Sequence, residues 1–480
     1  MPYSIGNKIV ATQHYLATQV GIKVLENGGN AFDAAIAISA VLGVVLPYSS
    51  GLGGDGFLLA KTPEGVIAYN ASGWAPKNSK KPKSLDDPNS VLVPGLVDLW
   101  EFVYERYCTM DANELLRPAI SLATNGFHVS RGLYNASIKS LRPYESWKRV
   151  YGGLRLAEKL KLPNMAEVLK RISKDFREFY EGKVSEEIIS GLLEHNVPVT
   201  HEDFAKFRGE RVDPIRLEYR DGYLVYELPP NSQGITTLQL LKLMQLTEVN
   251  KLPYEDNKRI SRLLDLYKIA YEDRNRYVSD PRFNKIDVYS LIREEYLIQR
   301  LNSGRFSGKL DPANDTTFFL VSDGENEVGF IQSLFHHFGS GIVVKDIPFN
   351  NRGLGFTDGA NDIAPHKRPL HTLSILYAEK EREAIMIGCA GADLRPQIHA
   401  LVFTYVVDYG MEIDQAVNAP RFAYTGDKVL VEKRLNYPGV LLDYYAAEVG
   451  IVQAMRRVRE GVYIGVADPR SDGISLSLIK

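Results

Sequence analysis

The chain has 480 residues, 45% of them hydrophobic and 24% charged, which is the composition of a soluble globular protein with a large core. Its formal net charge is −2, so no overall basic field favours nucleic acid or an anionic membrane surface as a partner. Cys108 and Cys389 are the only cysteines, and two thiols so far apart exclude a disulfide framework and a zinc knuckle while fitting a reducing compartment.

The sequence shows no targeting or membrane segment. The first eight residues lack the apolar stretch of a secretory signal. The longest apolar run, Ala34–Leu46, has 13 residues, whereas a helix needs ~20 residues to cross a bilayer. We therefore expect a buried helix at this run and a cytoplasmic protein, with no membrane and no nucleic-acid partner.

The first part of the chain predicts two helices, a tight turn and a hairpin. Helical spacing covers His14–Glu26, and an Ala-rich helix follows with Asp33 as its expected N-cap. The glycine-rich stretch Ser49–Phe57 stands between a helix and a strand, which is the reverse of the order in a phosphate-binding loop. We expect this stretch to allow close backbone packing instead. Strands at Phe57–Lys61 and Val66–Asn70 then predict a β-hairpin.

The middle of the chain is mostly helical. A helix over 111–125 has Asp111 and Glu114 at the spacing of a capping box and Gly126 as its stop. The other predicted elements are helices at Leu96–Tyr107, Thr236–Leu246 and Ile260–Asp273, a helix-rich segment from 133 to 210, and a strand at Tyr223–Leu228. This order predicts a layered α+β domain with helices outside a pair of sheets.

Two threonines open the apolar run Thr316–Ser322, which predicts a strand, and a second strand is expected after Asp323-Gly324. The segment before them, 307–314, is polar and rich in turn residues. If the chain is cut before Thr316, this residue gains a free α-amine beside its hydroxyl, and an α-amine titrates near pH ~7.7–8.0. One residue would then supply both nucleophile and base. Taken alone, two threonines at the start of a run are typical of an ordinary β-strand.

Short motifs in a fixed order along nearly the whole chain carry a family resemblance. They are Ser50–Phe57, Val93–Gly95, Arg117–Ala119, Asn125–Phe127, Pro229–Gly234, Asp280–Phe283, Phe338–Gly341, Lys367–Leu370, Asn418–Phe422 and Asp468–Arg470. No single motif is diagnostic. In their order and spacing, however, the chain resembles the γ-glutamyltranspeptidase family of N-terminal-nucleophile (Ntn) hydrolases.

The resemblance implies a four-layer αββα sandwich of the Ntn-hydrolase type, which is an α+β fold. It also implies a precursor that cuts itself between Asp315 and Thr316. The large subunit would be residues 1–315 and the small subunit residues 316–480. These two pieces of the same precursor would interleave as one αββα unit.

The resemblance also assigns catalytic roles. The family's nucleophile falls on Thr316, whose free amine is the expected base. The oxyanion donors fall on the backbone N–H groups of Gly391 and Ala392, in a turn that also fits a plain strand-to-helix connection. Ser333 falls where the family has a threonine whose hydroxyl holds the nucleophile, and the same position fits an ordinary strand serine.

The expected substrate-binding positions depart from the typical family pattern. Ser72 stands where the family has an arginine for the substrate α-carboxylate, and Arg352 stands where an acidic partner for the α-amine is expected. His371 and Thr372 replace two serines that bind carboxylate. A site without partners for both charges holds a zwitterion poorly, whereas Arg352 and Thr372 suit a lone carboxylate. Arg352 also fits a structural ion pair, and His371 also fits a core histidine.

These observations predict an autoprocessed threonine amidohydrolase or acyltransferase that cleaves small-molecule γ-glutamyl amides, such as glutathione, through an acyl-enzyme. The connection Phe356–Pro365 is shorter than the family's lid, which favours hydrolysis over transfer. Two alternatives stay open: an acylase for glutaryl-like amides, similar to cephalosporin acylases, and a non-catalytic homologue. We expect no cofactor and no metal, because the adjacent His336 and His337 would point to opposite faces of a strand.

Overall fold

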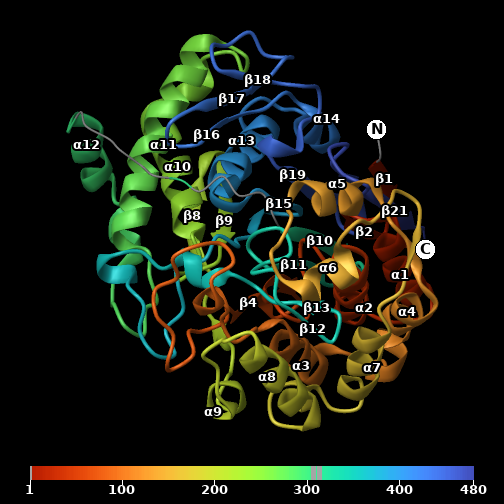
Figure 1. Ribbon diagram of the computed structural model, residues 1–480. Helices are drawn as coiled ribbons and strands as arrows, with labels where there is room; N and C mark the ends of the chain where they lie inside the picture. The colour runs from red at the N-terminus through yellow and green to blue at the C-terminus, as the bar shows by residue number, and fades with distance from the viewer. Residues whose placement is uncertain (1–2, 304–309, 311–315, 480) are drawn as a thin grey trace.

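The computed structural model describes residues 3–303, 310 and 316–479, and its framework is two seven-stranded antiparallel sheets (Figure 1). The first sheet has the order β1 (Tyr3–Gly6), β20 (Val462–Ala467), β19 (Ile451–Arg459), β15 (Glu383–Ala390), β14 (Leu376–Lys380), β9 (Tyr223–Glu227), β8 (Ile215–Tyr219). The second has the order β21 (Ile474–Leu478), β2 (Lys8–Thr12), β10 (Thr317–Ser322), β11 (Glu327–Ser333), β3 (Asp55–Thr62), β4 (Gly65–Ala71), β7 (Glu210–Val212).

Helices cover the outer face of each sheet, so the four layers are helix, sheet, sheet and helix, as predicted. The second sheet is covered by helices of the first half of the chain: α1 (Tyr15–Glu26), α2 (Ala31–Val45), α3 (Leu96–Tyr107), α4 (Ala112–Asn125), α5 (Arg131–Lys139), α6 (Glu145–Tyr151), α7 (Pro163–Ile172), α8 (Lys183–Glu194) and α9 (His201–Ala205). The first sheet is covered by later helices: α10 (Gly234–Leu246), α11 (Asn257–Tyr277), α12 (Glu294–Asn302), α13 (Arg395–Val407) and α14 (Ile413–Asn418).

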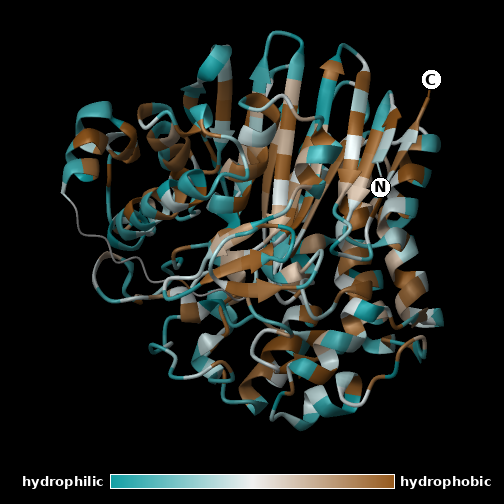
Figure 2. Cartoon of the chain, turned by 90° about the horizontal axis from the view of Figure 1, so that it is seen from above, coloured by the Kyte–Doolittle hydropathy of each residue, from teal (hydrophilic) through white to brown (hydrophobic). Residues whose placement is uncertain are grey.

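Strand β10 shows how the sequence produces these layers. Successive side chains of a strand point to opposite faces, and in β10 both faces are apolar. Phe318 and Leu320 pack between the two sheets, whereas Phe319 and Val321 pack against the helices behind the second sheet. All four side chains are fully buried. In Figure 2 the strands are correspondingly dominated by hydrophobic residues, while the helices carry both kinds.

Smaller strands complete the described part of the chain. They are the pairs β5 (Phe127–His128) with β6 (Lys159–Leu160) and β12 (Val343–Val344) with β13 (Ile347–Pro348), and the three-stranded group β16 (Phe422–Tyr424), β17 (Val429–Glu432) and β18 (Val440–Leu442). None of the helices in residues 3–303 and 316–479 combines the length and apolar character needed to traverse a bilayer.

The predicted helix starts need two corrections. The N-cap of α2 is Asn30, not Asp33, and its side chain accepts hydrogen bonds from the N–H groups of Phe32 and Asp33. Asp33 instead completes a capping box by accepting from the N–H of Asn30. Asp111 does cap α4, through the N–H of Asn113, but no capping box with Glu114 forms between these described residues.

The glycine-rich turn before β3 allows close backbone approach, which confirms the expectation from its sequence. A side-chain carbon on Gly54 would lie 2.4 Å from the carbonyl oxygen of Ser333, and one on Gly53 would lie 2.2 Å from that of Pro348. Only glycine fits such gaps. The turn therefore brings the start of β3 against the end of β11, where the predicted catalytic residues gather.

Candidate active site

Thr316 directly precedes β10, an inner strand of the second sheet, and is 2% exposed. In the register between β10 and β11, Thr317 faces Gln332, so Thr316 lies at the level of Ser333. The Oγ1 of Thr316 accepts a hydrogen bond from Nη2 of Arg395 at 3.2 Å. Asp315, the other residue of the predicted cleavage site, and the turn-rich segment 307–314 apart from Leu310 lie outside the described residues.

Arg395 is a site residue that the sequence analysis missed. It is fully buried at the first turn of α13, and its Nε donates to the carbonyl oxygen of Cys389 at 2.9 Å. One guanidinium thus bridges Thr316 and the strand that leads into the predicted oxyanion turn. The available signal was a charged residue at the start of a helix whose other residues are mostly apolar.

The predicted oxyanion turn follows β15 and is fixed by Gln233, the residue before α10, and by Arg274 of α11. Nε2 of Gln233 donates to the carbonyl oxygens of Ala392, at 2.9 Å, and Thr372, at 2.8 Å. Arg274 holds Gln233 in turn by donating to its Oε1 at 2.8 Å, and pairs with Asp393 at 2.7 Å. Ala392 has a φ of +42°, in the left-handed region, so the backbone of the turn is strained at the residue after Gly391.

Ser333 ends β11 and is 1% exposed. Its Oγ accepts a hydrogen bond from the N–H of Phe335 at 2.9 Å. In the register between β11 and β3 it faces Asp55. Ser333 therefore stands between the strand end that carries Thr316 and a second polar cluster built around Asp55.

Asp55 and His371 form the centre of that cluster, and both are fully buried. The N–H of Leu373 donates to Nδ1 of His371 at 3.2 Å, so Nε2 carries the proton and donates to Oδ2 of Asp55 at 2.9 Å. Burial and the nearby Arg352 hold the pKa of His371 well below its usual value, so the ring is neutral. Asp55 also accepts from the N–H of Gly73 at 2.9 Å. The sequence analysis did not single out Asp55.

Arg352 and Thr372 join the same cluster. Nη1 of Arg352 donates to Oγ1 of Thr372 at 3.2 Å, and its Nε lies 3.7 Å from Oδ2 of Asp55. The guanidinium also lies over the ring of Phe335, at 4.3 Å from the centroid. Burial raises the pKa of Asp55 to about 6, although Arg352 opposes this rise. The structure therefore brings together three of the four predicted substrate-binding residues, with Arg352 in an ion pair.

Ser72, the fourth predicted substrate-binding residue, lies just after β4 and is fully buried. Its Oγ accepts from Nδ2 of Asn231 at 3.0 Å, and the same nitrogen donates to the carbonyl oxygen of Pro369 at 2.6 Å. Asn231 belongs to the Pro229–Gly234 motif. The motif thus ties the segment after β4 to the segment that carries His371 and Thr372.

Thr316 also lines a cavity of about 490 Å³. Its described walls come from Gln13 after β2, from α5, from Tyr48, Ser49 and His337, from the end of β15, and from the segments 445–451 and 469–472. The described lining comes from both sides of β10: Gln13 follows β2, whereas Ser49 and His337 lie next to the end of β11. None of the four predicted substrate-binding residues is among the described lining residues.

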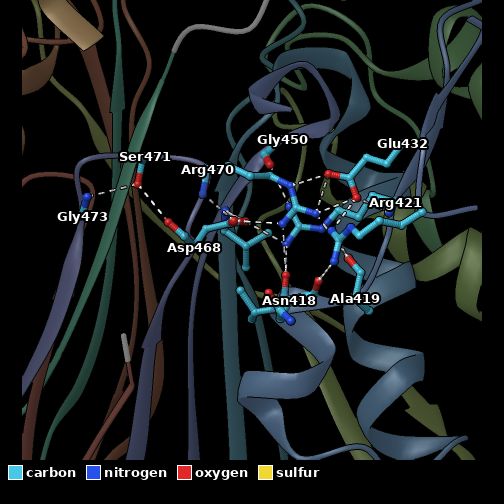
Figure 3. A network of polar contacts seen from close by, with 12 residues as sticks. Asn418, Ala419, Arg421, Glu432, Gly450, Asp468, Arg470, Ser471 and Gly473 are labelled. Carbon is cyan, nitrogen blue, oxygen red and sulfur yellow. Dashed lines mark hydrogen bonds and ion pairs between the residues drawn. The ribbon is translucent and has the colours of Figure 1, made fainter. Parts of the chain in front are cut away.

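Two of the sequence motifs, Asn418–Phe422 and Asp468–Arg470, meet in a buried ion network (Figure 3), and Arg470 of this network also lines the cavity. Asp468 pairs with Arg421 at 2.8 Å and with Arg470 at 2.9 Å, and Arg470 also pairs with Glu432 at 2.8 Å. All four side chains are buried. Burial acts to raise the pKa of Asp468, but the two arginines outweigh it and hold this pKa below its usual value. The network fixes the loop that carries Ser471 and Asp472.

His336 and His337 were expected to lie on a strand and to point to opposite faces, which argued against a shared metal ion. In the structure they follow β11 in a turn instead. Nδ1 of His337 lies 3.0 Å from Oγ of Ser140, and His336 donates its N–H to Oδ1 of Asn351. Across the described residues, no cluster of three His, Cys, Asp or Glu side chains has the arrangement needed to hold a metal ion.

Comparisons with known proteins agree with this architecture. A sequence profile of gamma-glutamyltranspeptidase matches residues 17–478. The chain is 32% identical to the glutathione hydrolase-like YwrD proenzyme of Bacillus subtilis over 99% of both chains. It is 30% identical to the glutathione hydrolase proenzyme of Escherichia coli over 96% of this chain and 90% of that protein.

A solved structure gives the same result for the fold. Cephalosporin acylase from Bacillus halodurans superimposes with a TM-score of 0.91 at 29% identity, covering 100% of this chain and 97% of that one. The two sheets between helical layers are therefore those of an Ntn hydrolase. Taken with the profile match along almost the whole sequence, these findings show that the chain belongs to the gamma-glutamyltranspeptidase family.

Proposed function

We propose that this chain is an autoprocessed threonine-nucleophile amidohydrolase or acyltransferase that acts on small-molecule amides through an acyl-enzyme on Thr316. The position of Thr316 carries the proposal: its hydroxyl contacts the Arg395 guanidinium at 3.2 Å, and its side chain lines a cavity of about 490 Å³. The names of the relatives in B. subtilis and E. coli describe proenzymes. This supports a processing cut, which we place between Asp315 and Thr316.

The proposed reaction starts when Oγ1 of Thr316 attacks the amide carbonyl while the α-amine of the same residue takes the hydroxyl proton. The carbonyl electron pair moves onto its oxygen, where the N–H groups of Gly391 and Ala392 would stabilise the charge. The intermediate then collapses, and the leaving amine takes the proton from the α-amine. An ester remains on Thr316. Water releases the acid from this ester, or a second amine accepts the acyl group.

The first candidate acyl donors are γ-glutamyl amides such as glutathione, which the names of the relatives support. The contact between Arg352 and Thr372 favours a second candidate, a glutaryl-like acyl group. A guanidinium 3.2 Å from a hydroxyl suits a terminal carboxylate, while Ser72 offers no cation for an α-carboxylate. The likeness to a cephalosporin acylase structure supports this second candidate.

The processing step is tested by intact masses under denaturing conditions. We expect the wild-type protein to give fragments of residues 1–315 and 316–480, and the Thr316→Ala variant to remain a single chain. Thr316→Ser keeps the hydroxyl that would attack the preceding carbonyl, so it should still be cut, and it serves as the control. An uncut wild-type chain with a normal fold would remove the amine base and favour a non-catalytic homologue.

The acyl preference is tested by comparing γ-glutamyl, glutaryl and butyryl p-nitroanilides with the processed enzyme. If Arg352 binds a carboxylate, glutaryl cleavage should exceed butyryl cleavage, and Arg352→Met should remove this advantage by raising KM. Equal rates on glutaryl and butyryl substrates in the wild type would mean that Arg352 has only its structural pairing with Asp55.

A further inference from the structure

A buried ion pair lies one helical turn beyond Arg395. His399 follows Arg395 by four residues on α13, so the two side chains lie on the same face of the helix, and both are fully buried. Nδ1 of His399 donates a hydrogen bond to Oε1 of Glu227 at 2.9 Å. Glu227 ends β9 and is also fully buried. The reaction proposed above assigns no role to this pair.

The surroundings of His399 keep its ring charged. Burial acts to lower the pKa of His399, but the Cys389 thiol and the Glu227 carboxylate outweigh it and raise this pKa to about 9. The ring is therefore an imidazolium at neutral pH, and its contact with Glu227 is an ion pair. A buried ion pair adds little net stability, because the desolvation of both charges offsets their attraction. The position of the pair beside Arg395 points to a role in the site instead.

Arg395 connects this pair to Thr316. Its Nη2 donates to Oγ1 of Thr316 at 3.2 Å. Burial acts to lower the pKa of Arg395, and the nearby Cys389 and Glu227 oppose this effect. The Glu227 carboxylate therefore acts on both cations of α13, because it pairs with one and attracts the other.

The charges around Arg395 come from few of the described residues. Asp393 is nearby but already pairs with Arg274 at 2.7 Å. Glu227 is then the acid shared by Arg395 and His399, and these two cations and one anion leave one net positive charge. If His399 were neutral, Glu227 would cancel the charge of Arg395 and weaken the field that it produces at the nucleophile.

We propose that His399 and Glu227 are positioning residues of the active site. The imidazolium takes up the charge of the carboxylate, so that Arg395 keeps its full positive field at the α-amine and hydroxyl of Thr316. Both residues act through Arg395. The inference rests on the function proposed above, in which this amine is the base, and it adds the pair that sets how readily the amine gives up its proton.

The test compares the pH dependence of kcat/KM in variants of the processed enzyme, on the anilide that the wild type cleaves best. His399→Gln leaves Glu227 facing Arg395 alone, so the amine of Thr316 feels less positive charge and its pKa rises. We expect the acidic limb of the profile to move to higher pH by up to about one unit. Glu227→Gln removes the acid, so it should not move the limb in that direction.

The double variant His399→Gln/Glu227→Gln gives the sharpest test. It removes one cation and one anion, so the charge of Arg395 is again unopposed and the limb should return close to its wild-type position. Damage to packing would not cancel in this way when the two substitutions are combined.

The other charged or imidazole side chains among the described lining residues of the cavity beside Thr316 are the same in every variant. They are Arg131, Lys139, His337, Glu448, Arg470 and Asp472. Because the comparison is between variants of one protein, the contributions of these groups to the profile cancel.

His366→Gln is the matched control. His366 also pairs with a carboxylate at 2.9 Å, that of Asp203, and neither residue is among the described lining of the cavity. This variant should leave the limb where the wild type has it.

A measurement that needs no turnover checks the charge directly. In protein labelled with ¹³C at Cε1 of histidine, the NMR signal that is missing from a His399 variant reports this ring. We expect the ring to stay protonated up to about pH 8 in the wild type and to lose its proton at lower pH in Glu227→Gln. The double variant, in which two amides can hydrogen-bond to each other, supplies the assignment if His399→Gln alone does not fold.

Three results would overturn the inference and leave the proposed function intact. The first is a His399 ring that is neutral at pH 7. The second is an acidic limb that His399→Gln does not move in a processed, folded enzyme. The third is a double variant whose limb stays away from the wild-type position. An uncut wild-type chain would instead remove the amine, and with it both the proposed function and this inference.

Discussion

Arg395 places a fully buried guanidinium 3.2 Å from the hydroxyl of Thr316. In the proposed mechanism the α-amine of Thr316 must be unprotonated to act as a base. A neighbouring cation disfavours a second positive charge and so lowers the pKa of such an amine. It also favours loss of the hydroxyl proton. We therefore assign Arg395 the role of keeping the α-amine of Thr316 unprotonated, and its hydroxyl easier to deprotonate, at neutral pH.

Replacing Arg395 with methionine is expected to shift the acidic limb of the kcat/KM profile to higher pH, by up to about one unit, because the amine loses its cationic neighbour. Profiles from pH 5 to 9, measured on the processed protein, report this shift. Arg395→Lys keeps the charge and should shift the limb less. An unmoved limb in the methionine variant, with an unchanged Tm, would assign Arg395 to packing alone.

Asp55 makes a second residue-scale prediction, because burial raises its pKa to about 6 in the folded protein, against ~3.9 in an unfolded chain. Between these two pH values the folded protein binds more protons than the unfolded chain, so this group makes stability fall as pH rises from about 4 to about 6. Above that range its contribution is constant. The shift corresponds to at most about 3 kcal/mol.

The measurement is the difference in unfolding free energy between the wild type and Asp55→Asn, from urea titrations at several pH values between 4 and 7. We expect the wild type to lose stability relative to the variant as pH rises, since asparagine cannot ionise. Taking the difference removes the contributions of groups common to both. A difference that stays constant over this range would mean that Asp55 ionises at its ordinary pKa.

At the scale of elements, the buried ion network joins α14, β17 and the loop between β20 and β21. Arg421 follows α14, Glu432 ends β17, and Asp468 and Arg470 lie in the loop. The network balances charge in the core, because burying an arginine without an acidic partner would cost several kcal/mol of folding free energy. The network thereby orders one wall of the cavity next to Thr316.

Glu432→Gln is expected to destabilise the protein by about 3–5 kcal/mol, because it leaves the buried Arg421 and Arg470 to share the single negative charge of Asp468. Thermal or urea unfolding measures the loss. Glu383→Gln is the control, since Glu383 pairs with Arg456 at a partly exposed site, 3.2 Å apart, and should cost less than about 1 kcal/mol. If Glu432→Gln lost as little stability as the control, solvent or a local rearrangement would be stabilising the buried arginines in place of Glu432.

Elements with strong periodicity could be predicted from the sequence, and the contacts between them could not. The helix ending at Glu26 and the hairpin around Thr62 follow from local patterns. The N-cap of α2 was misplaced because Asn30 and Asp33 are both capping residues and local rules cannot rank them. Arg395 and Asp55 were missed because their partners are distant in sequence and only the fold brings them to the site.

At the scale of the whole molecule, residues on both sides of the proposed cut build both sheets. Strands β1, β8 and β9 from before residue 315 share the first sheet with β14, β15, β19 and β20 from after it. In the second sheet β10 lies between β2 and β11. The strand order of such a sandwich does not follow from periodicity, and the family resemblance implied only the four-layer αββα architecture.

Strand β21 is among the last residues of the chain, and it pairs with β2, the direct neighbour of β10. Ser471 and Asp472 of the cavity wall are made only shortly before it. A growing chain on the ribosome therefore holds Thr316 long before it holds the strand and loop that complete its surroundings. If these surroundings are needed for the cut, activity begins only once the ribosome has made β21, and copies truncated before Ile474 stay inert.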